Sequence, residues 1–135
     1  MAKVNTILYL TMGTLGDATD FGDLLTTPSS PAGTMSATRG LMFGGNIGGG
    51  NYPAAIQYFA MDTLGNATDF GDSTHDGRSD LASCTNGTYG VWMGGYRAGP
   101  TKNFIDYITI DTTGDSTDFG DLTGTKGYRT GLSGD

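Results

Sequence analysis

Three kinds of residue are scarce or missing in this sequence. Glutamate is absent, and the 135 residues include one cysteine, Cys84, and only seven lysines and arginines. Because one cysteine cannot form an intrachain disulfide, we exclude a disulfide-stapled secreted module. The basic residues are scattered and the formal net charge is −7, which argues against a surface that follows nucleic-acid phosphates.

Long hydrophobic runs are missing as well. The apolar stretch that follows the N-terminus spans only a few residues, too short for a signal-peptide core or a membrane span. We therefore expect a chain that is made in a host cytosol and has no membrane partner. The shortage of good helix formers, together with 24 glycines and abundant threonine, favours many short strands over helices.

One five-residue motif organises the chain. Thr-Asp-Phe-Gly-Asp begins at residues 19, 68 and 117, so 49 residues separate successive copies. A fixed period of about 50 residues is typical of solenoids, propellers and repeat arrays. The rest of the chain is therefore interpreted as the spacing between these copies.

Each copy of the motif follows an apolar segment and a glycine-containing turn. The apolar segments are residues 7–12, 56–61 and 105–110, and the turns are residues 14–18, 63–67 and 112–116. Gly followed by Asp or Asn is a hairpin signal, because both residues tolerate positive φ. We predict that the motif is the returning strand, with its phenylalanine buried, its glycine at a bulge or a close backbone approach, and its aspartates closing turns.

Two further strands are predicted between successive hairpins. The first covers small residues at 34–37 and 81–84, and the second covers apolar residues at 41–45 and 91–95 that end in Gly-Gly. Four short strands in a repeat of about 50 residues are typical of one blade of a β-propeller. The predicted fold class is therefore all-β, made of four-stranded antiparallel sheets.

The strands that end in Gly44-Gly45 and Gly94-Gly95, the variable loops and the later tyrosine-bearing strands resemble the kelch repeat. The chain departs from that repeat because Trp92 precedes a Gly-Gly pair and phenylalanine stands late in each copy. The near-identical motif copies are also similar to those of divergent kelch-like structural proteins of tailed marine phages and cyanophages. The resemblance covers nearly the whole chain and implies a kelch-like propeller in a phage virion.

The predicted strands do not complete a propeller within one chain. They give half a blade at residues 4–33, blades at 34–80 and 81–123, and a partial strand at 124–135, whereas propellers have about four to eight blades. Exposed sheet edges favour pairing with other chains. We expect homo-oligomerisation to complete the ring; a fragment, or a short stack that docks on a larger partner, is the alternative.

No catalytic residue and no cofactor is predicted. His75 and Asp76 together with Cys84 would combine a base with a nucleophile, but neither the histidine nor the cysteine recurs in another repeat. A loop histidine and a packed cysteine are the favoured interpretation.

Repeated aspartates are weak candidates for calcium ligands. Oxygen donors recur at equivalent positions, including Asp17, Asp20, Asp69 and Asp118. Their spacing lacks the Asp-x-Asp-x-Asp-Gly pattern of a calcium loop. Turn closure is therefore the favoured interpretation, and no metal is predicted.

The loops after the two Gly-Gly pairs differ in sequence and length, which is typical of recognition segments on a constant frame. The candidate residues for contact with a ligand or partner are Asn46, Asn51, Tyr52, Tyr96, Arg97 and Lys102. Aromatic and amide side chains suit stacking on glycans, with Trp92 belonging either to that face or to the core.

The predicted function is non-enzymatic: a structural component of a phage virion, such as a tail, fibre or capsid-decorating protein, that acts through assembly. The alternative is a lectin-like adhesin whose loops bind host surface glycans. The expected partners are further copies of the chain, other virion proteins or glycans, and not nucleic acid. Some kelch propellers are oxidases, but the metal ligands that such an enzyme requires are missing from the sequence.

Overall fold

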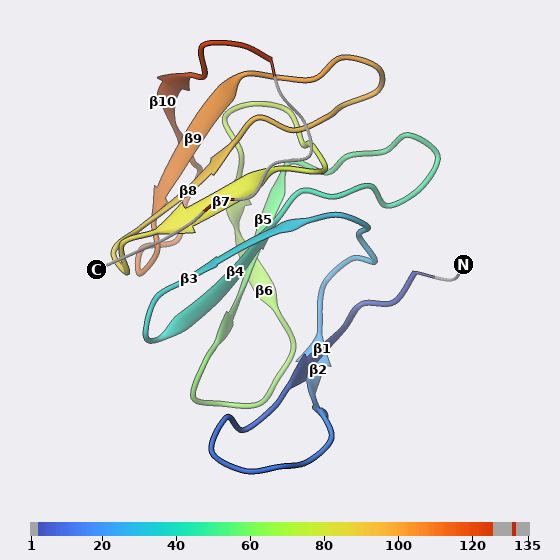
Figure 1. Cartoon of the computed structure of the whole chain (residues 1–135), viewed down its shortest axis with the longest axis vertical. Coiled ribbons are helices and arrows are strands. Elements are labelled where there is room, and N and C mark those ends of the chain that lie inside the picture. Colours follow the sequence, from blue (N-terminus) through green and yellow to red (C-terminus); the bar gives the residue numbers. More distant parts are fainter. Residues whose placement is uncertain (1–2, 126–130, 132–135) are drawn as a thin grey trace.

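The computed structural model describes residues 3–125 and residue 131, and it contains ten strands (Figure 1). The strands are β1 (Thr6–Tyr9), β2 (Thr19–Asp23), β3 (Ala32–Met35), β4 (Arg39–Phe43), β5 (Ala55–Ala60), β6 (Thr68–Asp72), β7 (Ala82–Thr85), β8 (Tyr89–Met93), β9 (Phe104–Thr109) and β10 (Thr117–Asp121). The described residues form no helix, and therefore none that is long and apolar enough to cross a membrane.

The strands form three antiparallel sheets, each built from sequence neighbours. Sheet I contains β1 and β2, sheet II contains β3 to β6, and sheet III contains β7 to β10. The prediction of an all-β chain with four-stranded antiparallel sheets is confirmed. Sheet II begins at Ala32, just before the expected boundary at residue 34, and sheet III begins at Ala82. Most of the partial strand predicted at 124–135 lies outside the described residues.

A β-bulge recurs in the last strand of every sheet. Pairing shifts by one residue at the phenylalanine of the motif, so that Phe21, Phe70 and Phe119 are each left without an opposite residue. The glycine that follows has a φ of 153° in β2, 147° in β6 and 134° in β10. This conformation favours glycine, which explains why the motif requires one at this place.

The bulge glycines also permit a close backbone approach between sheets. A Cβ atom added to Gly22 would overlap the carbonyl oxygen of Gly65, and one added to Gly71 would overlap that of Gly114. Within the described part of the chain, an added Cβ on Gly120 meets nothing within 4 Å. The three glycines therefore share one backbone conformation but differ in whether a neighbouring sheet covers them.

This difference predicts unequal effects of alanine at two equivalent positions. Gly71→Ala and Gly120→Ala both place a Cβ at a φ that is essentially restricted to glycine, which costs about 1–3 kcal/mol. Only Gly71→Ala also forces apart two packed backbones, so we expect it to lower the free energy of unfolding by about 1–3 kcal/mol more. Urea denaturation of the two variants checks this, and equal losses would contradict it.

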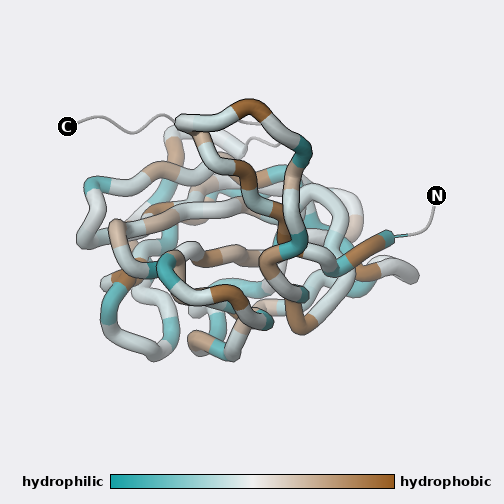
Figure 2. The backbone as a smooth tube through the Cα atoms, turned by 90° about the horizontal axis from the view of Figure 1, so that it is seen from below, coloured by the Kyte–Doolittle hydropathy of each residue, from teal (hydrophilic) through white to brown (hydrophobic). Residues whose placement is uncertain are grey.

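The hydrophobic core lies between sheets II and III. Its largest member is Trp92, which is 1% exposed and stacks on Phe43 at a centroid distance of 4.7 Å. The face of β9 that carries Asp106 and Ile108 is buried against sheet II, and Ile110 just beyond the strand is buried with it. Hydrophobic segments also lie at the outer edge of the molecule near the N-terminus (Figure 2).

Sheets II and III are joined along their first strands. The Thr34 hydroxyl donates to the Cys84 carbonyl at 3.3 Å, and the Thr85 hydroxyl donates to the Met35 carbonyl at 3.0 Å. The Ser83 hydroxyl donates to the Gly33 carbonyl in the same row. The short side chains of β3 and β7 thus allow these two strands to lie side by side.

Candidate functional site

The junction between sheets I and II is a set of backbone hydrogen bonds that the motif provides. The amide of Gly65 donates to the Phe21 carbonyl at 2.9 Å, and the amide of Ala67 donates to the Asp23 carbonyl at 2.8 Å. The Asp23 amide in turn donates to the Asn66 side-chain oxygen at 2.9 Å. The Phe-Gly-Asp segment of one sheet is therefore bound by the hairpin turn of the next.

The junction between sheets II and III repeats this pattern. Gly114 donates to the Phe70 carbonyl at 2.8 Å, and Ser116 donates to the Asp72 carbonyl at 2.9 Å. The Asp72 amide donates to the Asp115 carboxylate at 2.9 Å, as Asp23 does to Asn66. In each sheet we call the Phe-Gly-Asp segment the edge and the Gly-(Asp/Asn)-(Ala/Ser) segment the turn. At both junctions the edge of one sheet and the turn of the next sheet make the same three hydrogen bonds.

A polar side chain reaches back across each junction from the middle of an apolar strand. Gln57 of β5 accepts a bond from the Leu25 amide at 2.7 Å and donates to the Thr26 hydroxyl at 3.2 Å. Asp106 occupies the equivalent place in β9, because 49 residues separate it from Gln57. Both side chains fix the connector that follows the preceding sheet.

Asp106 forms a buried ion pair in this position. Its side chain and that of Arg78 are both fully buried, and the Arg78 guanidinium lies 2.5 Å from one carboxylate oxygen. The other oxygen lies 2.7 Å from Nδ1 of His75, whose ring stacks on Phe104 at 4.0 Å. The guanidinium carbon also lies over the rings of Phe43 and Phe104, 5.8 and 5.4 Å from their centroids. The stability of the buried Arg78 charge therefore depends on the Asp106 carboxylate.

Sequence reasoning missed this cluster. His75 does lie in a loop, as predicted, but its ring binds Asp106 and is packed against Phe104. The available signal was a polar residue at equivalent positions of two otherwise apolar strands, Gln57 and Asp106. Burial of a carboxylate in a strand calls for a cationic partner, which here comes from a connector 28 residues away.

The outer faces of sheets I and III carry the same junction elements without a neighbour among the described residues. Phe119 is 69% exposed, whereas Phe21 and Phe70 are 9% and 3% exposed. The prediction that the motif phenylalanine is buried is thus wrong for the third copy, because no described sheet covers it. On sheet I, Leu8, Leu10 and Met12 are likewise exposed. Exposed apolar surface of this kind is typical of an interaction site.

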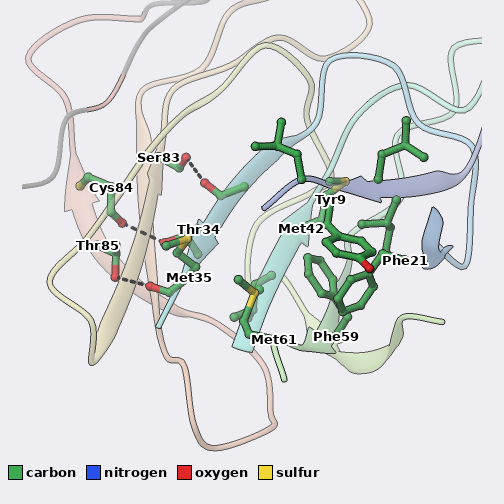
Figure 3. A pocket seen from close by; sticks show the side chains of 16 residues that line it. Tyr9, Phe21, Thr34, Met35, Met42, Phe59, Met61, Ser83, Cys84 and Thr85 are labelled. Carbon is green, nitrogen blue, oxygen red and sulfur yellow. Dashed lines mark hydrogen bonds between the residues drawn. The ribbon is translucent and has the colours of Figure 1, made fainter. Parts of the chain in front are cut away.

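A groove of about 680 Å³ runs beside β1, on the side opposite its partner β2 (Figure 3). Tyr9, Phe21 and Phe59 gather at one end of the groove, and the hydrogen-bonded row of β3 and β7 closes the other. No described strand pairs with the other edge of β1, and this edge borders a largely apolar cavity, a combination that suits an added β-strand. In the described part of the chain sheet I contains two strands whereas sheets II and III contain four, and the groove lies on the side where further strands would pair.

The predicted ligand loops lie at one end of the sheets. Tyr52 and Tyr96 come together edge to face, with ring centroids 6.2 Å apart, and both are half-buried. Asn51 is exposed in the same loop as Tyr52. Asn46 is directed to its own loop, where its side-chain oxygen accepts from the Gly48 amide at 2.7 Å.

The two predicted basic residues are partly engaged within the chain. Arg97 lies 3.3 Å from the exposed Asp76 and donates to the Gly77 carbonyl, and the Lys102 ammonium lies 6.0 Å from the Phe104 ring centroid. Trp92 belongs to the core and is not available to stack on a ligand. The structure therefore brings together two of the predicted ligand residues, Tyr52 and Tyr96, with Arg97 beside Tyr96 in sequence.

The weak metal candidates lie at bulges and turns. Asp20 and Asp118 each accept a bond from the amide of the bulge glycine two residues later, at 3.1 and 2.9 Å. Asp17 is exposed in the turn of sheet I, and Asp69 is exposed in β6. Among the described residues no group of three or more His, Cys, Asp or Glu side chains is placed to hold a metal ion. Cys84 is a half-buried residue of β7.

No protein-family model and no curated protein matches this chain. Among solved structures, that of YjhT is similar, with a TM-score of 0.66 at 10% sequence identity. The alignment covers 82% of this chain and 42% of that one, so the chain spans less than half of the length of YjhT. At this level of identity the similarity shows the fold alone.

Proposed function

We propose that this chain is a non-enzymatic structural protein that acts through assembly with further copies of itself. The observation that carries the proposal is the exposure of junction elements at both ends of the sheet array, with Phe119 at one end and Leu10 at the other. Where a neighbouring sheet is present, the motif phenylalanine is buried, and the residues at the place of Leu10 are half-buried (Phe59) or buried (Ile108). The exposed surface at each end is therefore of the same kind as the surfaces that join two sheets within the chain.

A kelch-like propeller completed by oligomerisation is the architecture we propose for the assembled state. Three sheets that associate through one repeated junction support it, as does the open groove beside β1. The setting that we propose is a phage virion, as a tail, fibre or capsid-decorating component. The support for this setting is the resemblance of the Thr-Asp-Phe-Gly-Asp copies to those of phage structural proteins.

Sedimentation velocity of the purified chain over a wide range of concentrations tests the proposal. We expect species whose masses are multiples of the 14.0 kDa chain, because exposed apolar faces gain free energy by mutual burial. A folded 14.0 kDa monomer at every concentration would contradict the proposal.

A lectin-like adhesin is the second candidate, favoured by the edge-to-face pair of Tyr52 and Tyr96 on neighbouring loops. A glycan array tests it with Tyr52→Ala and, as the matched control, Tyr89→Ala at the opposite end of the strands. If the loops bind glycans, signals are present for the parent and for Tyr89→Ala and are lost in Tyr52→Ala. Absence of binding by the parent, or signals that survive Tyr52→Ala, would contradict the adhesin.

A further inference from the structure

We propose that the edge of sheet III binds the turn of sheet I in a second copy of this chain, by the three hydrogen bonds found at the internal junctions. In this arrangement the Gly16 amide donates to the Phe119 carbonyl, the Ala18 amide donates to the Asp121 carbonyl, and the Asp121 amide donates to the Asp17 carboxylate. The inference rests on the proposed function of assembly and specifies the surface and the register.

The two segments without a partner among residues 3–125 and 131 have the chemistry that the internal junctions use. The turn Gly16-Asp17-Ala18 lies 49 residues before Gly65-Asn66-Ala67, and it supplies the same two amides and a side-chain oxygen. The edge Phe119-Gly120-Asp121 is identical in sequence to the edges of sheets I and II. Each chain therefore presents both members of a pair that is already joined twice within it.

The unmated edge already has the backbone shape that binds a turn. Gly120 has a φ of 134°, close to the 147° of the mated Gly71, and the pairing of β10 with β9 shifts at Phe119 as it does in the mated sheets. The Asp118 carboxylate accepts from the Gly120 amide at 2.9 Å, as Asp20 does from Gly22 at 3.1 Å. An edge that is ordered before binding loses little conformational entropy on docking.

The apolar side chains of the two free faces also match. At the first junction Phe21 packs edge to face on Phe59, with centroids 5.3 Å apart, and Leu10 holds the place of Phe59 in sheet I, 49 residues earlier. Phe119 and Leu10 are 69% and 59% exposed. Docking would bury both, as the second junction buries Phe70 and Ile108.

The two aspartates that face each other across this contact have a precedent within the chain. At the second junction Asp72 and Asp115 already lie together, and the Asp72 backbone amide stabilises the Asp115 carboxylate by donating a hydrogen bond to it. Asp121 and Asp17 repeat that pair across the proposed contact. The contact joins unlike faces, so copies add head to tail and form a ring if the rotation closes.

Two single variants and their mixture test the inference by light scattering. Phe119→Asp blocks the edge of sheet III and Leu10→Asp blocks the face of sheet I; both side chains are exposed, so circular dichroism should be unchanged. We expect each variant alone to be a 14.0 kDa monomer and the mixture to form a one-to-one dimer. The dimer is expected because one intact edge and one intact turn remain in the mixture.

Leu15→Asp is the matched control. Its equivalent Leu64 stays 59% exposed beside the mated turn of sheet II, so we expect Leu15→Asp to keep the mass of the parent. If the parent assembles and the two blocking variants do so equally, another surface is used; the inference fails while assembly stands. A mixture that stays monomeric also overturns the inference, and a monomeric parent overturns both the inference and the proposed assembly.

Discussion

Asp106→Asn is expected to destabilise the folded chain by about 3–5 kcal/mol, because it leaves the Arg78 charge buried without a counter-charge. Arg78 and Asp106 are both fully buried, and the carboxylate also accepts a hydrogen bond from the His75 ring. The asparagine is close to the same size, so the loss is electrostatic rather than a cavity effect. Urea denaturation of the parent and of Asp106→Asn at the same protein concentration measures this loss.

A surface ion pair in the same region provides the control. Asp76 is 74% exposed and lies 3.3 Å from Arg97, so Asp76→Asn should cost about 0–1 kcal/mol. Replacing Arg78 and Asp106 together by Met and Leu should recover most of the loss, since no buried charge then remains unpaired. An Asp106→Asn variant as stable as Asp76→Asn would show that the buried pair is not formed.

Phe70→Ala is expected to lower the free energy of unfolding by about 3–5 kcal/mol, whereas Phe119→Ala should change it by about 0.5 kcal/mol or less. The two residues occupy the same place in identical motifs, but Phe70 is 3% exposed and Phe119 is 69% exposed. The motif residues are identical, and each phenylalanine packs edge to face on a tyrosine of its own sheet, so the difference reports mainly on the neighbouring sheet.

This comparison is best made in the Leu10→Asp background, in which the proposed contact between copies is blocked and Phe119 keeps its exposure. Urea titrations of the two alanine variants then compare one mated and one unmated edge. If Phe119→Ala costs as much as Phe70→Ala, the outer face of sheet III is covered within the chain and the account of the free edge is wrong.

The repeat made most of the fold predictable. A spacing of 49 residues places the same hairpin three times, and the observed strands follow those positions within a few residues. The bulge at Gly22, Gly71 and Gly120 was also predictable, because glycine inside a strand pattern indicates a conformation that other residues resist. These features are local, so the sequence near each one determines them.

The buried ion pair was not predictable in the same way. Arg78 and His75 lie in a connector, and Asp106 lies in a strand of the next sheet. His75 and Asp106 do not recur at the equivalent places of the other repeats, and in sheet II Gln57, the counterpart of Asp106, bonds Thr26 instead. Their contact depends on how two sheets pack, and the periodicity of a single strand carries no information about that.

Exposure of the third motif copy depends on a neighbour that the motif itself does not specify. The three copies of Thr-Asp-Phe-Gly-Asp are identical, yet the phenylalanine is buried in two and exposed in one. The Tyr52 and Tyr96 pair is similar, since two loops of unrelated sequence meet only when sheets II and III are adjacent. The sequence identifies such residues as candidates for an interface or a ligand site, and the packing of the sheets decides whether they are buried, exposed or in contact.

Electron cryo-microscopy of the assembled chain tests the central claim most directly, because it shows which surfaces join neighbouring copies. We predict that the sheets continue from one copy to the next at the spacing of the internal junctions, with Phe119 packed against Leu10 and the Gly16 turn bonded to the Phe119-Gly120-Asp121 edge. Particles in which copies meet through any other surface, with Phe119 still exposed, would contradict the account.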